Sequence, residues 1–222
     1  MDVSVYNQIK AACAAHNALL VAVSKTKPNE AIAALYAEGQ RDFGENYVQE
    51  LLIKHDALAK DIHWHFIGHL QSNKVKMIAP FVHMIHAVDS FKLLQEIEKQ
   101  AAKNNRVIDV LLQLFVATEE TKYGMDTNEL TTCLAYYEAQ KATMQHVRIR
   151  GIMGMASFTE DMAQVRDEMQ QIATVFKQIK KTFFIGKDFF DTCSMGMSGD
   201  YQIALEEGST LLRIGSKLFG SR

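Results

Sequence analysis

Apolar segments with strand character recur along the chain and alternate with segments of helical periodicity. Between the apolar segments, for example in Phe91–Asn104 and Met162–Lys181, apolar residues recur at spacings of three and four, which predicts amphipathic helices. Eight strands that alternate with helices predict an α/β fold, a closed (β/α)8 barrel of the TIM type, with a doubly wound open sheet as the alternative. The eight predicted strands are Leu19–Thr26, Arg41–Asn46, His63–Gly68, Val82–Asp89, Val107–Ala117, Val147–Ser157, Phe189–Ser194 and Leu211–Gly215.

The remaining segments indicate no domain boundary within the chain. Residues from Met1 to Asn17 have helical character, and we expect them to pack on the barrel as an extra N-terminal helix. Asp89 and Ser90 precede Phe91 and provide side chains that cap a helix N-terminus. No Pro/Gly/Ser-rich linker, repeat or charge block interrupts the 222 residues. We therefore expect residues 1–222 to form a single domain.

Composition and charge exclude several classes of function. Hydrophobic residues make up 48% of the chain and the formal net charge is −2, so nucleic acid and anionic membrane surfaces are disfavoured as partners. Cys13, Cys133 and Cys193 are far apart and outside any C-x-x-C spacing, which predicts neither disulfides nor a thiolate metal site. No signal sequence or apolar run long enough for a membrane span is present. These features predict a soluble, cytoplasmic protein.

Lys25 lies at the carboxyl end of the first predicted strand, on the same face as Val21 and Val23. In a (β/α)8 barrel these strand ends form the reactive face, and a partly desolvated lysine there favours its neutral, nucleophilic form. Lys25 is therefore the candidate nucleophile. One alternative is a lysine that merely extends its amine to solvent, and another is Lys27, which is followed by Pro28, as the reactive residue.

Two loops near the end of the chain are rich in small residues. Ser194–Asp200 follows the seventh predicted strand, and Arg213–Ser216 closes the eighth. Barrels of this type bind phosphate in these loops, where backbone N–H groups, a helix N-terminus and hydroxyls approach the oxygens. We predict that Ser198, Gly215 and Ser216 bind a phosphate group. Ordinary turns would explain the small residues of either loop alone. They would not explain why both loops are expected opposite a lysine at the end of a strand.

Three other groups of residues are weaker candidates. Arg213 shares strand parity with Gly215, so its guanidinium is predicted to face the same site, with an outward salt bridge as the alternative. Asn46, and Tyr47 after it, end the second strand and are candidates for the same site. His63, His65 and His69 have a spacing open to metal ligands, but no matching carboxylate and histidine set follows the other strands, so we expect no metal site.

Several segments together resemble the YggS/PROSC family of pyridoxal phosphate homeostasis proteins. The resemblance covers nearly the whole chain. One departure is the segment Leu114–Thr118, which replaces a more usual polar run. The most specific segments are VAVSKTKP (21–28), RDFGENYVQE (41–50), WHFIGHLQSNK (64–74), HAVDS (86–90), TKYGM (121–125), GIMGMAS (151–157), SMGMSGDYQIALEEGSTLLRIGS (194–216) and KLFGSR (217–222).

The resemblance implies a barrel related to the N-terminal domain of alanine racemase, of PLP fold type III. Pyridoxal 5′-phosphate (PLP) is the implied cofactor, with Lys25 matching the lysine that forms the Schiff base. Beside the cofactor, Arg213 is expected to face the pyridine nitrogen, Asn46 to lie near the ring, and Ser198, Gly215 and Ser216 to hold the phosphate. An arginine donates only, so it would leave that nitrogen unprotonated and weaken the cofactor as an electron sink.

The implied function is PLP storage and delivery in the cell rather than an assigned reaction, with PLP-dependent apo-enzymes as recipients. The alternative is a PLP-dependent amino-acid racemase, which needs an acid/base group on each face of the substrate carbon. Alanine racemase draws its second base from an additional domain, and no such domain is expected here, which also favours a monomer. A third hypothesis, a metal-dependent hydrolase using His63 and His65, predicts bound metal in the purified protein.

Overall fold

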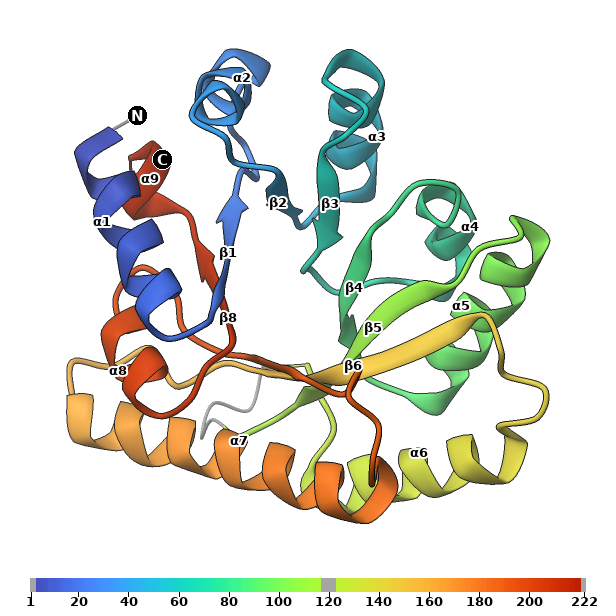
Figure 1. The fold of residues 1–222 in the computed structure, drawn as a ribbon. Coiled ribbons are helices and arrows are strands. Elements are labelled where there is room, and N and C mark those ends of the chain that lie inside the picture. The colour runs from blue at the N-terminus through green and yellow to red at the C-terminus, as the bar shows by residue number, and fades with distance from the viewer. Residues whose placement is uncertain (1–2, 117–122, 221–222) are drawn as a thin grey trace.

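In this computed structural model, which describes residues 3–116 and 123–220, eight parallel strands form a closed barrel (Figure 1). The strands follow one another around the barrel in the order β1-β2-β3-β4-β5-β6-β7-β8. The strands are β1 (Leu19–Val23), β2 (Asp42–Glu45), β3 (His63–Phe66), β4 (Met84–Val88), β5 (Ile108–Leu114), β6 (Val147–Gly154), β7 (Thr192–Ser194) and β8 (Leu211–Ile214). The helices are α1 (Val3–Ala15), α2 (Asn29–Ala37), α3 (Val48–Ala57), the 3-10 turn η1 (Ser72–Lys74), α4 (Val75–Ile78), α5 (Phe91–Lys103), α6 (Thr127–Gln140), α7 (Met162–Phe183), α8 (Tyr201–Glu206) and α9 (Ser216–Phe219).

The predicted (β/α)8 barrel is confirmed, and each predicted strand contains an observed one. The observed strands are shorter than the predicted ones, mainly at their carboxyl ends. Residues such as Lys25, Asn46 and Gly215 lie just beyond the hydrogen-bonded ladder rather than in it. A sequence pattern does not separate a strand from the loop that extends it, because both keep the same alternation of side chains.

Closure of the barrel pairs the first strand with the last. Val21 lies opposite Arg213 in the ladder between β1 and β8, and β2 follows on the other edge with Val23 opposite Gly44. Because all the ladders are parallel, the carboxyl ends of the strands meet at one end of the barrel. The loops that carry Lys25 and Ser216 are therefore brought together from opposite ends of the sequence.

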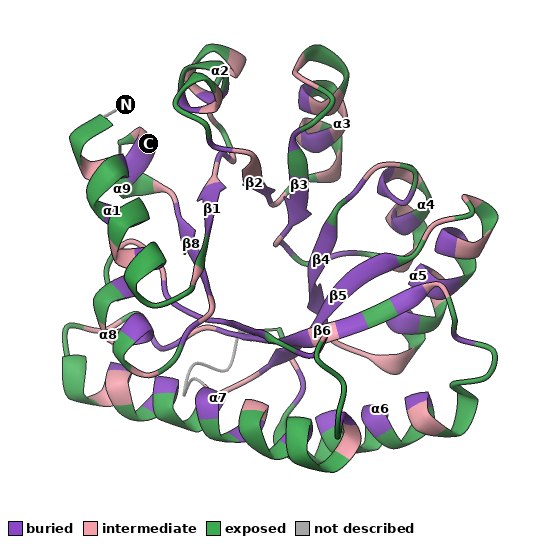
Figure 2. Cartoon of the chain, in the orientation of Figure 1, coloured by how far each residue is buried: buried purple, intermediate pink, exposed green. Residues whose placement is uncertain are grey.

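Alternation along the strands divides the apolar residues into two layers. One small cluster fills the barrel interior and includes Val21, Leu111, Met153 and Leu211. A larger cluster lies between the outer face of the strands and the helices, and it includes the intervening residues of the same strands, such as Leu212. Figure 2 shows the strands almost wholly buried, while the helices alternate buried and exposed positions. Burial on both strand faces explains why the sequence shows apolar runs rather than strict alternation.

Two helices begin at the residues that the sequence predicts, α5 at Phe91 and α7 at Met162, and they end within two residues of the predicted positions. The Ser90 hydroxyl accepts a hydrogen bond from the Leu93 N–H at the start of α5, as predicted, and Asp161 caps α7 in the same way. The predicted N-terminal helix is present as α1, which packs close to α9, so that the two ends of the chain lie near each other (Figure 1).

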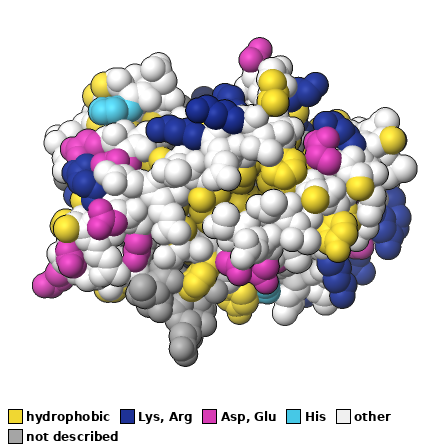
Figure 3. Space-filling view, turned by 90° about the horizontal axis from the view of Figure 1, so that it is seen from below, with side chains coloured by type: hydrophobic (Ala, Val, Ile, Leu, Met, Phe, Trp, Pro, Cys, Tyr) yellow, Lys and Arg dark blue, Asp and Glu magenta, His cyan; other side chains and the backbone are white. Residues whose placement is uncertain are grey.

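The surface shows no field of one charge on the face in Figure 3, where basic and acidic side chains are interspersed and hydrophobic side chains gather near the centre. Cys13, Cys133 and Cys193 are free and buried. None of the helices in residues 3–116 and 123–220 combines the length and the apolar character that a membrane span requires.

Candidate functional site

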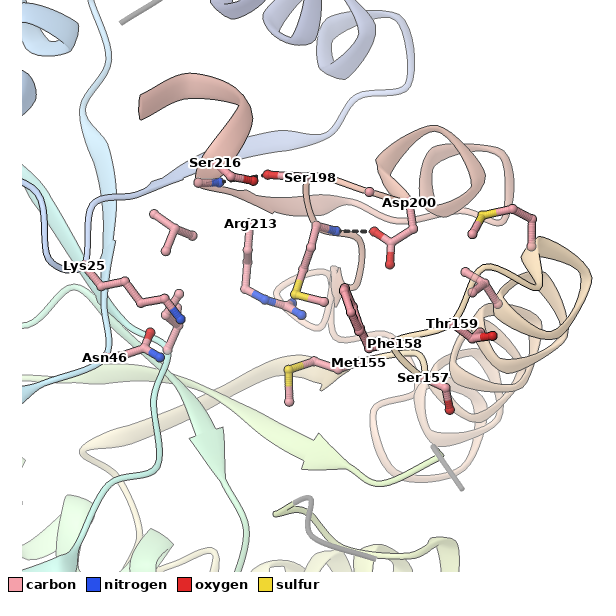
Figure 4. A pocket seen from close by; sticks show the side chains of 17 residues that line it. Lys25, Asn46, Met155, Ser157, Phe158, Thr159, Ser198, Asp200, Arg213 and Ser216 are labelled. Carbon is pink, nitrogen blue, oxygen red and sulfur yellow. Dashed lines mark hydrogen bonds between the residues drawn. The ribbon is translucent and has the colours of Figure 1, made fainter. Parts of the chain in front are cut away.

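A cavity of about 460 Å³ opens at the carboxyl end of the barrel. The predicted cofactor residues Lys25, Asn46, Ser198, Arg213, Gly215 and Ser216 all line it. Its volume lies in the range typical of small-molecule sites. Figure 4 shows Lys25 and Asn46 on one side of this cavity, Ser157 and Thr159 on the other, and Arg213 between them.

Lys25 lies two residues beyond Val23, the last residue of β1, and points its amine into the cavity (Figure 4). Its side chain is half-buried and lies on the same strand face as Val23, which also lines the cavity. Lys27, the alternative nucleophile, is directed elsewhere: its Nζ donates to the carbonyl oxygens of Phe219 and Gly220, at 3.3 and 3.0 Å. The geometry therefore favours Lys25 over Lys27 as the residue that meets a ligand.

A buried ion-pair network holds the backbone on both sides of Lys25. Lys54 from α3 donates to the Ser24 carbonyl oxygen at 2.7 Å, to Glu45 at 2.8 Å and to Glu50 at 2.6 Å. Glu50 in turn accepts the Thr26 N–H at 2.5 Å. Both chain neighbours of Lys25 are thus tied to α3.

This network carries two costs that the surrounding structure must offset. Thr26 has a φ of 62°, in the left-handed region that a β-branched residue rarely adopts. Glu45 is fully buried, and this burial raises the pKa of its carboxyl group, although hydrogen bonds from Lys54 and Ser24 oppose the shift. Sequence analysis missed these residues. The only available signal was the i, i+4 spacing of Glu50 and Lys54, which places the two side chains together if the segment is helical.

Ser198, Gly215 and Ser216 surround one end of the cavity. The Ser198 hydroxyl accepts hydrogen bonds from the N–H groups of Gly215 and Lys217, at 3.3 and 3.4 Å, and so joins the loops after β7 and β8. A Cβ added at Gly215 would approach the Val23 carbonyl oxygen to 3.3 Å, which is tighter than ordinary contact. The backbone at Gly215 therefore lies close against Val23, and a side chain at this position would require the two to move apart.

The loop after β7 depends on Gly196 and Asp200. Gly196 has a φ of 95°, and a Cβ there would lie 2.4 Å from the Ala204 Cβ, so a glycine is required for the turn. Asp200 accepts the Met197 N–H at 2.5 Å and also lines the cavity, and burial raises the pKa of its carboxyl group. The helices that follow these loops, α8 and α9, are short, so backbone N–H groups and hydroxyls matter more here than the predicted helix dipole.

Arg213 extends from β8 into the cavity floor and is 4% exposed. It donates to the Ser194 hydroxyl and, at 3.0 Å, to the Gly154 carbonyl oxygen. Burial lowers the pKa of the Arg213 guanidinium to about 10, with Asp200 acting in the opposite direction, so the group stays charged at neutral pH. The inward orientation excludes the alternative of an outward salt bridge.

Asn46 follows β2 and lines the cavity beside Lys25, whereas Tyr47 is exposed and lies outside it. Gly68 allows this position, because a Cβ at residue 68 would lie 2.5 Å from the Asn46 carbonyl oxygen. The Asn46 Oδ1 is buried and has no hydrogen-bond partner among the described residues. A buried acceptor or donor without a partner is unfavourable, so this atom favours a ligand that contacts it.

The three histidines considered as metal ligands do not form one cluster. His69 lies beyond the carboxyl end of β3, where it pairs with Asp89 at 3.2 Å and stacks on Tyr123. His63 and His65, the first and third residues of β3, both contact Asp42, and neither lines the cavity. The departure from the family pattern at Leu114–Thr118, like the TKYGM and KLFGSR segments, lies partly outside the described residues.

Sequence analysis also missed the apolar wall of the cavity. Met155, Phe158 and Met162 come from the end of β6 and the start of α7, and Phe158 is 96% exposed at the mouth. Methionines in a chain with 11 of them gave no signal, because they are usually core filler.

Comparisons with known proteins agree with this geometry. Residues 5–222 match the model of the alanine racemase N-terminal domain family. The chain is 39% identical to the pyridoxal phosphate homeostasis protein of Aquifex aeolicus, over 92% of this chain and 87% of that protein. It is 38% identical to the human protein of the same name, over 91% of this chain and 76% of that protein.

Solved structures with the same fold include proteins of higher and of lower sequence identity. PipY of Synechococcus elongatus with PLP bound superposes with a TM-score of 0.81 at 34% identity, covering 92% of this chain and 93% of that one. Alanine racemase of Bartonella henselae superposes with a TM-score of 0.70 at 19% identity, covering 100% of this chain and 60% of that one, which shows likeness of fold alone.

Proposed function

Because this chain belongs to the alanine racemase N-terminal domain family, and within it to the pyridoxal phosphate homeostasis proteins, we propose that it binds PLP and takes part in PLP storage and delivery. The observation that carries the proposal is the single cavity lined by Lys25, Arg213 and the two loops of small residues. The bound PLP in the related PipY structure supports the same cofactor.

We assign each group of the cofactor to residues of the cavity. PLP supplies an aldehyde that reacts with primary amines and a ring that withdraws electrons. Lys25 is the residue that forms the Schiff base, and Arg213 faces the ring nitrogen. Ser198, Gly215 and Ser216 hold the phosphate, and Asn46 lies near the ring. The buried Asn46 Oδ1, which has no hydrogen-bond partner among the described residues, is a feature that this ligand fits.

The titratable residues of the cavity favour carriage over catalysis. Of the described residues that line it, only Lys25, Asp200 and Arg213 are acids or bases, and Arg213 is fixed by two hydrogen bonds. Racemisation needs a proton donor and acceptor on each face of the substrate carbon. Asp200 accepts the Met197 N–H, so among the described residues Lys25 is the one base that faces the ligand, and this supports exchange of the cofactor with amines more than turnover.

The covalent site is tested with Lys25→Ala, with Lys27→Ala as the matched control. The purified protein is loaded with PLP, reduced with borohydride, digested, and the labelled peptide is identified. We expect Lys25→Ala to lose both the visible absorbance band and the label, and Lys27→Ala to keep them. A label on Lys27 in the Lys25→Ala protein, with a full band, would reverse the assignment.

The racemase alternative is tested on the loaded protein. It is incubated with L-alanine and other amino acids in D2O, while PLP transfer to an apo-enzyme is followed in parallel. We expect transfer and only slow incorporation of α-deuterium. Racemisation at a rate near the enzyme median of about 10 s⁻¹ would overturn the carrier function.

We further propose that residues 1–222 act as one PLP-binding unit, as a monomer in the cytoplasm, with PLP-dependent apo-enzymes as the recipients. The small net charge of −2 and the interspersed surface charges support a partner other than nucleic acid or an anionic membrane. Sedimentation of the loaded protein over a range of concentrations measures the oligomeric state, and a mass of one chain is expected throughout.

A further inference from the structure

A second cluster of polar side chains lies at the opposite end of the barrel from the PLP cavity. Asp42 is the first residue of β2, His63 is the first residue of β3, and His83 directly precedes β4. Because the strands are parallel, these three positions meet at the amino end of the barrel. None of the three lines the cavity that holds Lys25.

The three side chains present their ligand atoms to one another. One nitrogen of each histidine and a carboxylate oxygen of Asp42 all lie within 4.8 Å of one another. The Asp42 Oδ1 is 3.2 Å from the His63 Nδ1, and the rings of His63 and His83 stack with centroids 4.5 Å apart. The side chain of His63 is 50% exposed, so an ion from solvent reaches the cluster directly.

A further, buried histidine contacts the carboxylate of Asp42. His65 is fully buried, and its Nε2 lies 3.0 Å from the Asp42 Oδ1. Its Nδ1 lies 2.9 Å from the Nε2 of His86, which is also fully buried. Since an ionised carboxylate only accepts, His65 donates through Nε2 and accepts through Nδ1 from His86. Such outer contacts orient metal ligands in known sites.

We propose that Asp42, His63 and His83 bind a divalent transition-metal ion of the zinc class, with water completing its coordination. Imidazole nitrogen and carboxylate oxygen together suit Zn²⁺ and its neighbours Co²⁺ and Ni²⁺, whereas Ca²⁺ and Mg²⁺ prefer all-oxygen sites. The ion takes the place of the hydrogen bond between His63 and Asp42, and the neutral His63 ring keeps its one proton on the nitrogen that does not bind the ion.

The electrostatic surroundings leave Asp42 available for the ion. The neighbouring acid at this end, Asp109, is paired with Arg148 at 2.6 Å and with Arg150 at 3.0 Å. Asp42 is instead contacted by histidines. A neutral histidine has a ring nitrogen that can bind a metal ion, whereas an arginine stays protonated and cannot bind one. The bound ion would join the starts of three consecutive strands and so stabilise the barrel without touching the PLP cavity.

The test uses the full chain, stripped of metal with a chelator and loaded with PLP. Zn²⁺ is added in a calorimetric titration, and Co²⁺ is added while its visible d–d absorbance is recorded. We expect one ion per chain and a higher midpoint of thermal unfolding with Zn²⁺. His63→Gln and His83→Gln should each lower the affinity for Zn²⁺ at least tenfold. The control is His16→Gln, which replaces an exposed histidine directly after α1 and should leave the affinity for Zn²⁺ unchanged.

Two control measurements separate an effect on Zn²⁺ binding from an effect on folding or on the PLP cavity. Thermal unfolding of each metal-free variant establishes that it is folded, and the visible PLP band establishes that its cavity is intact. Equal Zn²⁺ affinity in the wild type and in the His63→Gln/His83→Gln double variant would overturn the site, as would a loss of affinity in His16→Gln alone. His65→Gln should weaken binding less than His83→Gln, because it removes orientation and not a ligand.

Discussion

At the scale of single residues, the pairing of β1 with β8 decides which side chains meet. Val21 lies opposite Arg213, so alternate residues of both strands face the barrel interior together. Lys25 and Gly215 continue the same alternation beyond the ladder and reach one cavity. A shift of β8 by one residue against β1 would turn Arg213 and Gly215 outward while Val21 and Lys25 still faced inward, because side chains alternate between faces.

The phosphate assignment predicts a difference between PLP and pyridoxal, which lacks the phosphate. We expect pyridoxal to bind far more weakly than PLP to the wild-type protein. Gly215→Asp should weaken PLP much more than pyridoxal, because the new carboxylate occupies the space beside Val23 and repels the phosphate. Equilibrium dialysis measures both affinities. Equal affinities for the two ligands in the wild type would contradict the phosphate site.

Lys54 is predicted to act as a positioning residue for Lys25. Lys54→Met alone leaves the buried Glu45 carboxylate without its cation and should cost about 3–5 kcal/mol of unfolding free energy. The pair Glu45→Gln/Lys54→Met removes both charges and should recover most of that loss. It should still form the visible PLP band more slowly, because the Ser24 carbonyl oxygen is no longer tied to Lys54 of α3.

The matched control for this network is Lys60→Met, an exposed lysine near the end of α3. Stopped-flow absorbance gives the rate of band formation, and urea unfolding gives the free energy. If the stable double variant forms the band at the wild-type rate, the network is structural and does not position Lys25.

At the scale of elements, short local signals set the helix boundaries while the barrel sets their packing. α5 begins at a serine cap and turns one face inward, where Leu94, Ile97 and Ala101 are fully buried. The same spacing is visible in the sequence as an amphipathic pattern. Helix termini need partners for their exposed N–H groups, which is why a single side chain has a measurable effect.

Ser90→Ala should therefore destabilise the protein by about 1 kcal/mol, within the range of about 0.5–2 kcal/mol known for lost helix caps. The Leu93 N–H loses the hydroxyl that accepts it at 3.3 Å. Ser90→Asp retains an acceptor and is the matched control, with little change expected. Urea unfolding followed by circular dichroism measures both. A loss in Ser90→Asp as large as in Ser90→Ala would mean that capping is not the cause.

At the scale of the whole molecule, the barrel interior is polar at its amino end, apolar in the middle and open at its carboxyl end. Ion pairs of Asp109 with Arg148 and Arg150 and the histidine cluster close the amino end. The apolar layer around Leu111 and Met153 separates them from the PLP cavity. Two ends with different chemistry can therefore bind different ligands independently.

The buried histidines predict that stability falls in acid. Burial lowers the pKa of His86 well below its ordinary value of 6.5, so the folded protein keeps it neutral while the unfolded chain takes up a proton below that value. Stability is therefore full above pH 6.5 and falls as the pH decreases. Between pH 7.5 and 5.5 the loss from this one group is about 1.4 kcal/mol.

His86→Gln isolates this contribution, because glutamine does not titrate and its amide can still donate to His65. Urea unfolding of both proteins at the two pH values gives two losses of free energy. The wild-type loss should exceed the variant loss by the predicted amount. Equal losses would show that His86 is protonated in the folded protein.

The amino-acid sequence by itself predicted eight strands that alternate with helices, and it placed the candidate cofactor residues at the carboxyl ends of those strands. Period-two and period-3.6 patterns are local, so they are visible without knowledge of distant contacts. Because the carboxyl ends of barrel strands always lie together, Lys25, Arg213, Ser198 and Gly215 were also assigned to one site from position alone.

Only the tertiary structure decided which side chains contact across elements. Lys54 is 29 residues from Lys25, and His83 is 20 residues from His63, and no periodicity links such pairs. Their contacts depend on strand register, on helix rotation over the sheet and on closure between β1 and β8. The register, the rotation and the closure depend on how the whole chain packs, because each face of a strand or helix is buried by residues that are remote in sequence.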